Sequence, residues 1–236
     1  MDQQFTRGRN RLLGALPPPD LALLSPHLKD VNFEQGAVLL EAGNVIEQVY
    51  FPQNGMISLL AVMRDGSGIE TATIGREGAV GVMAGFGSRS SAGRAVMQIA
   101  GDVSQIAAAK FRTAIETSAA LRDLVVRYND VQMALVQQTA GCNALHHVEK
   151  RFCRWLLQTR DRCESDEIPL TQEFLAEMLG VQRTSVTPIA RNLQAAGLIK
   201  YRRGRIEIID RAGLESKSCE CYESVRLKNE ETFLTI

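Results

Sequence analysis

The spacing of apolar residues changes its period along the chain. Between residues 31 and 108, apolar runs of strand length are separated by turn signals at intervals of about 8 to 12 residues, as in β-sandwiches and barrels. Glycines mark many of the breaks: Gly36, Gly43, Gly55, Gly66, Gly75 and Gly101. The runs include GAVLLEAG, QVYFPQNG, MISLLAVM, IETATIG, AVGVM and RAVMQIAG. These patterns predict an all-β domain, preceded in residues 10–28 by two short helices that three prolines separate.

Helical spacing follows this β segment. A short helix is predicted from about Lys110 and a long one from about Ala119. Along the long helix, a narrow seam repeats every three and four residues in turn: Leu121, Leu124, Tyr128, Val131, Leu135, Gln138, Cys142 and Leu145. Such a seam is typical of two-stranded pairing, so its first seven members are predicted to form a homodimer interface. The alternative is a helix that packs on its own β domain.

The C-terminal part begins after a predicted break in the long helix around residues 143–147. The next helix is expected to bury Val148, Phe152, Trp155 and Leu156. A polar loop, DRCESDEIP, leads into residues 170–210, where the spacing of Ala176, Gly180 and Val186 is typical of a helix-turn-helix. Two short strands after Gly197 add a wing, and one further helix is expected from about Arg211.

This winged segment is basic although the whole chain has a formal net charge of zero. From residue 183 to residue 205 there are six basic residues and no acidic one: Arg183, Arg191, Lys200, Arg202, Arg203 and Arg205. A local excess of positive charge is what a nucleic-acid backbone requires. We therefore expect the segment to bind double-stranded DNA. The alternative is a structural helical hairpin whose basic residues form a solvated face.

Composition is that of a globular chain, with 45% hydrophobic and 23% charged residues. No apolar run approaches the roughly 20 residues of a membrane span, and the N-terminus lacks a signal-peptide core, so we expect a cytoplasmic protein with reduced cysteines. Cys219 and Cys221 form a CxC pair with no histidine beside it, which supports a zinc site only weakly. No metal site is predicted, and any redox role stays open for Cys142, Cys153, Cys163, Cys219 and Cys221.

With its order of β domain, long helix and winged helix, the chain resembles the bacterial Crp/Fnr transcription regulators over nearly its whole length. LLEAGNVIEQVYFPQNGMISLL is similar to the family's LIxxGExxxxLYxIxxGxVxL segment, and LTQEFLAEMLGVQRTSVT to its IxxxDIAxxLGxSRETVxR motif. CNALHHVEKRFCRWLL and the CECY end resemble one subgroup. The resemblance implies an α+β fold: a β jelly roll of the cyclic-nucleotide-binding type in residues 1–117, a dimerisation helix and hinge in 118–146, and a winged helix-turn-helix in 147–236.

The resemblance also assigns roles in DNA binding. Arg183 stands at the family's base-reading arginine, and Thr184 and Thr187 would face bases. Contacts with the DNA backbone would come from Thr171, Gln182, Ser185, Arg191, Arg202 and Arg203. Thr184 replaces a common glutamate and Pro188 a common arginine, so a different half-site is expected. The implied partners are a palindromic operator, a second copy of the chain and RNA polymerase.

The ligand pocket departs further from the family pattern. Val82 stands where the family has a ribose-binding glutamate, and Ser91 where it has a phosphate-binding arginine. We therefore expect that cyclic AMP is not the effector; a non-standard cyclic-nucleotide pocket is the alternative. The candidate pocket residues are Val82, Arg89, Ser91, Arg94, Val136 and Gln137. No cofactor is assigned from the sequence. An N-terminal iron–sulfur sensor is not supported, because no cysteine precedes Cys142. Haem ligation at His146 or His147 stays open.

Two other functional classes fit less well. An enzyme on a double-stranded β-helix scaffold would hold a metal with two or three histidines and a carboxylate. The β region contains neither histidine nor cysteine, so no catalytic residues are predicted. A sensing or interaction module that does not touch DNA would leave the basic bias of the winged segment unexplained.

Overall fold

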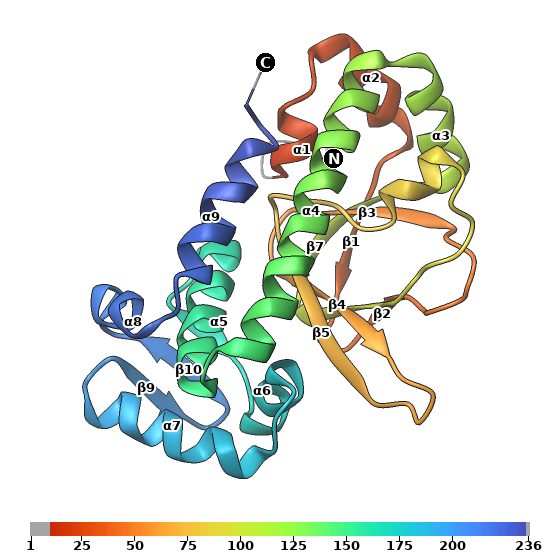
Figure 1. The fold of residues 1–236 in the computed structure, drawn as a ribbon. Coiled ribbons are helices and arrows are strands. Elements are labelled where there is room, and N and C mark those ends of the chain that lie inside the picture. The colour runs from red at the N-terminus through yellow and green to blue at the C-terminus, as the bar shows by residue number, and fades with distance from the viewer. Residues whose placement is uncertain (1–9, 235–236) are drawn as a thin grey trace.

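A computed structural model describes residues 10–234 (Figure 1). The expectation of no signal peptide rests partly on residues 1–9, which lie outside this range. No helix in the described range is long and apolar enough to cross a bilayer. The chain forms a β domain with short helices at its N-terminal end, then one long helix, then a winged helix with two further helices after it.

Two antiparallel sheets make up the β domain, which confirms the predicted roll. One has the strand order β2-β6-β4-β5 and the other β1-β7-β3. The bounds are β1 (Lys29–Phe33), β2 (Val38–Leu40), β3 (Gln48–Pro52), β4 (Met56–Val62), β5 (Gly68–Ile74), β6 (Arg94–Ile99) and β7 (Gly101–Ala107). Buried side chains from both sheets, among them Ile57, Met97 and Val103, meet in one apolar core.

One expected strand, AVGVM in residues 79–83, is wrong. Only Val80 pairs in β fashion, with Tyr50. Gly81 has a φ of +84°, which turns the backbone into the 3-10 helix η2 (Val82–Phe86). The left-handed conformation is open to glycine without strain, so the apolar run ends as a turn instead of a strand.

Short helices cover the N-terminal side of the domain. They are α1 (Arg11–Gly14), α2 (Pro18–Leu24) and the 3-10 helix η1 (Ser25–His27). Pro18 and Pro19 begin α2, where the first N–H groups have no helical partner and proline is tolerated. After β7, α3 (Ala108–Thr117) leads into α4 (Ala119–Leu145), which Ser118 caps by accepting a hydrogen bond from the Leu121 N–H.

The C-terminal domain is a winged helix with three strands. It contains α5 (Val148–Cys163), β8 (Glu167–Pro169), α6 (Gln172–Leu179), α7 (Arg183–Ala195), β9 (Ile199–Arg202) and β10 (Arg205–Ile208). The break expected around residues 143–147 lies at His146 and His147. The stretch predicted to be a polar loop contains β8, because Ile168 is buried and pairs with Ile206 of β10.

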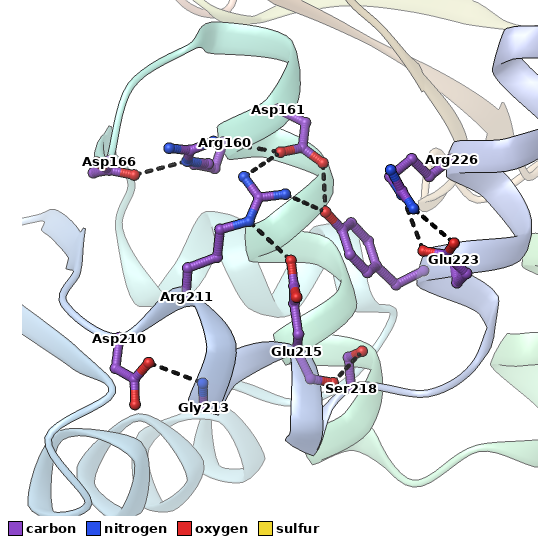
Figure 2. A network of polar contacts seen from close by, with 11 residues as sticks. Arg160, Asp161, Asp166, Asp210, Arg211, Gly213, Glu215, Ser218, Glu223 and Arg226 are labelled. Atoms are coloured by element: carbon purple, nitrogen blue, oxygen red, sulfur yellow. Dashed lines mark hydrogen bonds and ion pairs between the residues drawn. The ribbon is translucent and has the colours of Figure 1, made fainter.

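The tail forms two helices where one was predicted, α8 (Arg211–Lys217) and α9 (Cys221–Glu231). A polar network holds them to α5 (Figure 2). Arg211 forms an ion pair with Asp161 at 3.0 Å and donates to Glu215 at 2.8 Å and to the Tyr222 hydroxyl at 2.8 Å. Tyr222 in turn donates to Asp161 at 2.6 Å. This network fixes the start of α9, which then runs beside α4 (Figure 1).

The seam of α4 is filled by the same chain, which corrects the predicted dimer interface. Leu121, Leu124 and Tyr128 pack into the core of the β domain, whereas Val131 and Leu135 pack on Val225 of α9. Cys142 lies against Cys219 and Cys221. Gln138 donates to Cys221, also within the chain. The exposed fractions of the six apolar seam residues from Leu121 to Cys142 do not exceed 4%, so a second chain cannot reach them.

Replacing Leu135 with alanine should lower the free energy of unfolding by about 2 to 5 kcal/mol, because it opens a cavity between α4 and α9. Chemical denaturation measures the loss. Leu145→Ala is the matched control, since Leu145 is 82% exposed and should change stability by less than about 0.5 kcal/mol. Sedimentation of Leu135→Ala should match that of the parent. If Leu135→Ala instead loses subunit association while its stability is unchanged, the predicted dimer interface along the seam would be supported.

Candidate nucleic-acid interface and ligand pocket

The helix pair α6–α7 is built by local signals that the sequence carries. The Thr171 hydroxyl accepts a hydrogen bond from the Phe174 N–H at 3.2 Å and caps α6. Gly180 ends α6 in the left-handed conformation at a φ of +62°. Ala176 and Val186 are buried where the helices meet. These contacts hold the first turn of α7 at the surface, at the outer edge of the molecule (Figure 1).

The predicted DNA-binding residues lie at the start of α6, on α7 and on the wing between β9 and β10. Eight of them are exposed: Thr171, Gln182, Arg183, Thr184, Ser185, Arg191, Arg202 and Arg203. Thr187 is half-buried, and its hydroxyl donates to Gln172 at 2.8 Å. Pro188 lies inside α7 without ending it, and its missing N–H leaves the Thr184 carbonyl without its helical donor.

Carboxylates from neighbouring elements reduce the basic bias seen in the sequence. Arg183 pairs with Glu173 of α6 at 2.5 Å, and Arg205 with Glu167 of β8 at 2.9 Å. Lys200 pairs with Glu207 at 3.4 Å. The three glutamates lie outside residues 183–205 in the sequence, but the fold brings them into contact with basic residues of that range. Within residues 10–234, Arg191, Arg202 and Arg203 form no ion pair and carry the net positive charge of this face.

The wing is a tight turn between β9 and β10. Arg203 and Gly204 have φ values of +47° and +75°, so both occupy the left-handed region. The turn leaves the Arg202 and Arg203 side chains in solvent. The Leu170 N–H donates to the Gly204 carbonyl at 2.7 Å, which joins the wing to the start of α6. The wing is thereby held beside the start of α6, the first helix of the pair.

A cavity of about 490 Å³ lies between the β domain and α4. Four of the six candidate pocket residues line it: Val82, Ser91, Arg94 and Val136. Arg89 and Gln137 do not: both side chains are exposed and lie outside the lining. Arg94 is held by Glu41 at 3.0 Å, and the Ser91 hydroxyl donates to the Gly93 carbonyl at 2.6 Å.

Sequence reasoning missed the polar groups that α4 contributes to this cavity. Asn129 and Gln132 line it beside Met133. The Gln132 side-chain oxygen is buried without a hydrogen-bond partner among the described residues. These positions lie on a face of α4 next to the apolar seam, and only the packing of the helix on the sheet shows that they face the cavity. The remaining lining is largely apolar, with Leu40, Leu59 and Ile74 among its residues.

Comparisons with known proteins agree with both domains. A Crp-like helix-turn-helix domain matches residues 150–217, and a cyclic nucleotide-binding domain matches residues 30–118. The chain has the two domains of a Crp/Fnr-type transcriptional regulator. No curated protein matches it.

Solved structures share the fold of this Crp/Fnr-type chain at low identity. FixK2 from Bradyrhizobium japonicum is 13% identical with a TM-score of 0.70, and the match covers 81% of this chain and 98% of FixK2. TTHB099, a CRP-family transcriptional regulator from Thermus thermophilus, is 20% identical with a TM-score of 0.66 over 80% and 96% of the two chains. The c-di-GMP responsive regulator CLP from Xanthomonas campestris is 17% identical with a TM-score of 0.64 over 81% and 99%.

In this Crp/Fnr-type chain the DNA-binding domain is joined to the β domain by buried polar contacts. Trp155 of α5 donates to the Glu70 carboxylate of β5 at 2.9 Å, and Ser58 donates to its other oxygen at 2.7 Å. Arg162 of α5 forms an ion pair with Glu77 at 2.8 Å. All of these side chains are at least nine-tenths buried. Burial raises the pKa of Glu70 to about 7, and the Ser58 and Trp155 hydrogen bonds oppose the rise.

This shift predicts a stability that falls with pH. The folded protein holds the Glu70 proton more tightly than the unfolded chain, whose carboxyl has its ordinary pKa of 4.5. The resulting stabilisation is complete below about pH 4.5, is lost as pH rises to about 7, and is on the order of 3 kcal/mol. Thermal unfolding from pH 5 to pH 8 should show the loss in the parent and in Glu116→Gln, an exposed control on α3. Glu70→Gln should remove it; an unchanged pH slope would contradict the burial argument.

Proposed function

We propose that the chain is a homodimeric, sequence-specific DNA-binding regulator that places α7 in the major groove. The observation that carries this proposal is the exposure of the first turn of α7 and of the wing. Three exposed arginines without ion-pair partners within residues 10–234 lie on these two elements, at Arg191, Arg202 and Arg203. A DNA backbone is the partner that such a face favours. DNA as the partner places this activity in the cytoplasm.

Base reading is assigned to the first turns of α7. Arg183 presents a guanidinium that can donate two hydrogen bonds to the O6 and N7 of guanine, while Thr184 and Thr187 face neighbouring bases. Glu173 holds Arg183 in the free protein, so the guanidinium exchanges this carboxylate for a base on binding. Because both side chains of the pair are more than half exposed, the exchange costs little.

Positioning is assigned to residues that surround the reading helix. Thr171, Gln182 and Ser185 lie near the helix N-termini and contact phosphates. Arg191 contacts a phosphate one turn beyond Pro188. Arg202 and Arg203 of the wing contact the DNA backbone next to the groove. Such contacts fix the register of the protein without reading sequence.

A dimer needs a surface other than the buried seam. Val126 and Met133 are 53% and 56% exposed on the opposite face of α4, and Ala140 is exposed seven residues further on. Residues seven apart lie on one face of a helix that pairs with a copy of itself. We infer that this face pairs two chains on a palindromic operator, and that the bound dimer contacts RNA polymerase.

The cavity beside α4 is the place for an effector. Ser91 and Val82 there replace groups that would bind a cyclic nucleotide, and Glu41 already holds Arg94. A mostly apolar small molecule with one or two polar groups fits this lining better than a nucleotide does. A non-standard nucleotide pocket is the second candidate, supported by the family match over residues 30–118.

Replacing Arg183 with alanine should flatten the preference for a duplex selected from a random pool. One bidentate contact accounts for about 1 to 3 kcal/mol of discrimination between bases. Arg203→Ala should instead weaken all duplexes alike and reduce the slope of log K against log salt by about 1. Fluorescence anisotropy measures both. Arg64→Ala, the same charge change on the β4–β5 turn, is the control and should leave binding unchanged. If Arg183→Ala and Arg203→Ala behaved identically, the assignment of base reading to one and backbone contact to the other would be wrong.

Calorimetry with cyclic AMP should give no heat of binding at micromolar concentration. A ribose hydroxyl next to Val82 would lose its hydrogen bonds to water, at about 1 to 3 kcal/mol for each unpaired group. Micromolar affinity together with tighter operator binding would instead support the nucleotide pocket.

A further inference from the structure

Four potential metal ligands meet where α4 ends and α9 begins. Cys142 lies in the last turn of α4, and His146 is the residue that follows the helix. Cys219 lies in the turn after α8, and Cys221 is the first residue of α9. The Sγ atoms and an imidazole nitrogen all lie within 4.8 Å of one another. The pair Cys219 and Cys221, weak as a metal motif in the sequence, thus gains two ligands from 75 or more residues away.

Two of the six distances between ligand atoms match a tetrahedral ion, and the others do not exceed 4.8 Å. With zinc–sulfur bonds of about 2.3 Å and zinc–nitrogen bonds of about 2.0 to 2.1 Å, a tetrahedron has sulfur–sulfur edges of about 3.8 Å and sulfur–nitrogen edges of about 3.5 Å. The Sγ atoms of Cys142 and Cys219 are 3.6 Å apart. The Sγ of Cys221 and the Nδ1 of His146 are 3.5 Å apart. A bonded disulfide would need sulfurs at about 2.0 Å, so the thiols are separate.

Polar and charged groups surround the four ligands and contact two of them directly. The His146 Nε2 lies 3.1 Å from the Glu220 carboxylate, an arrangement that places the proton on Nε2 and leaves the Nδ1 lone pair facing Cys221. A carboxylate that orients a ligand histidine in this way is common at zinc sites. Gln138 donates from its amide to the Cys221 sulfur at 2.9 Å. The guanidinium of Arg154 is buried, and its positive charge would offset the excess negative charge of three thiolates around a divalent ion.

We propose that Cys142, His146, Cys219 and Cys221 bind one zinc ion. Four protein ligands leave no open position, so the ion is structural and not catalytic. Binding releases the three thiol protons to solvent, because thiolate is the ligand form. The ion would tie the end of α4 to the junction of α8 and α9, and it would therefore fix the hinge at residues 146–147 on which the winged helix is carried. The proposal does not depend on DNA binding.

Elemental analysis of the full chain, purified without chelators, tests this directly. We expect about one zinc per chain, retained in Cys163→Ser, a cysteine control outside the group, and lost in Cys219→Ser. Cobalt substitution should give the visible bands of tetrahedral thiolate-bound cobalt. Glu220→Gln replaces a solvent-exposed side chain and should fold; it should weaken zinc affinity about 10- to 100-fold, because the histidine loses its charged acceptor.

Three results would overturn the proposal. The first is a parent protein that contains less than about one-tenth of a zinc per chain and takes up none on titration. The second is iron with acid-labile sulfide, which would make the group a cluster site. The third is a Cys142–Cys219 disulfide in the native protein, seen by mass spectrometry. If Cys219→Ser fails to fold, the parent's zinc content and the Glu220→Gln affinity still decide between the outcomes.

Discussion

The arrangement of this protein depends on what covers the apolar stripe of α4. The upper part of the stripe, including Leu121 and Leu124, belongs to the core of the β domain. The lower part, Val131 and Leu135, belongs to the contact with α9. One 27-residue helix thus carries two separate packing surfaces, and α9 links its lower half to the winged helix through the Arg211 and Tyr222 network. The orientation of α7 relative to the β domain follows from this packing.

Strand β5 provides a second connection between the ligand cavity and the DNA-binding domain. Thr71 and Ile74 face the cavity. Glu70 accepts the hydrogen bond from Trp155, and a side chain on Gly180 would come within 2.9 Å of Ile69. A ligand that displaces β5 or α4 would therefore act on contacts made by α5 and α6. Because Glu70 and Glu77 are buried, separating the domains would have to rehydrate both carboxylates together with their partners, which favours two discrete arrangements over a gradual one.

Helix caps, turns and the buried face of each helix could be predicted from the sequence, whereas contacts between residues far apart in the chain could not. The Thr171 cap, the Gly180 turn and the buried Val186 specify α6 and α7 within a few residues, so the winged helix was predicted correctly. The heptad spacing of α4 showed that one face is buried but not what buries it. Val225, the partner of Leu135, lies in a tail predicted as a single helix. In the same way, no spacing rule connects His146 with Cys221, and Glu173 neutralises Arg183 from outside the basic run.

The most direct test of sequence-specific DNA binding by a dimer is a hydroxyl-radical footprint of the full chain on a duplex that it selects from a random pool. Two copies of α7 held by paired α4 helices should protect two inverted half-sites on one face of the DNA, with centres roughly 34 Å apart. Protection of a single half-site would contradict the dimer. Failure to select any sequence at low salt would contradict the assignment of α7 and the wing as a DNA-reading surface.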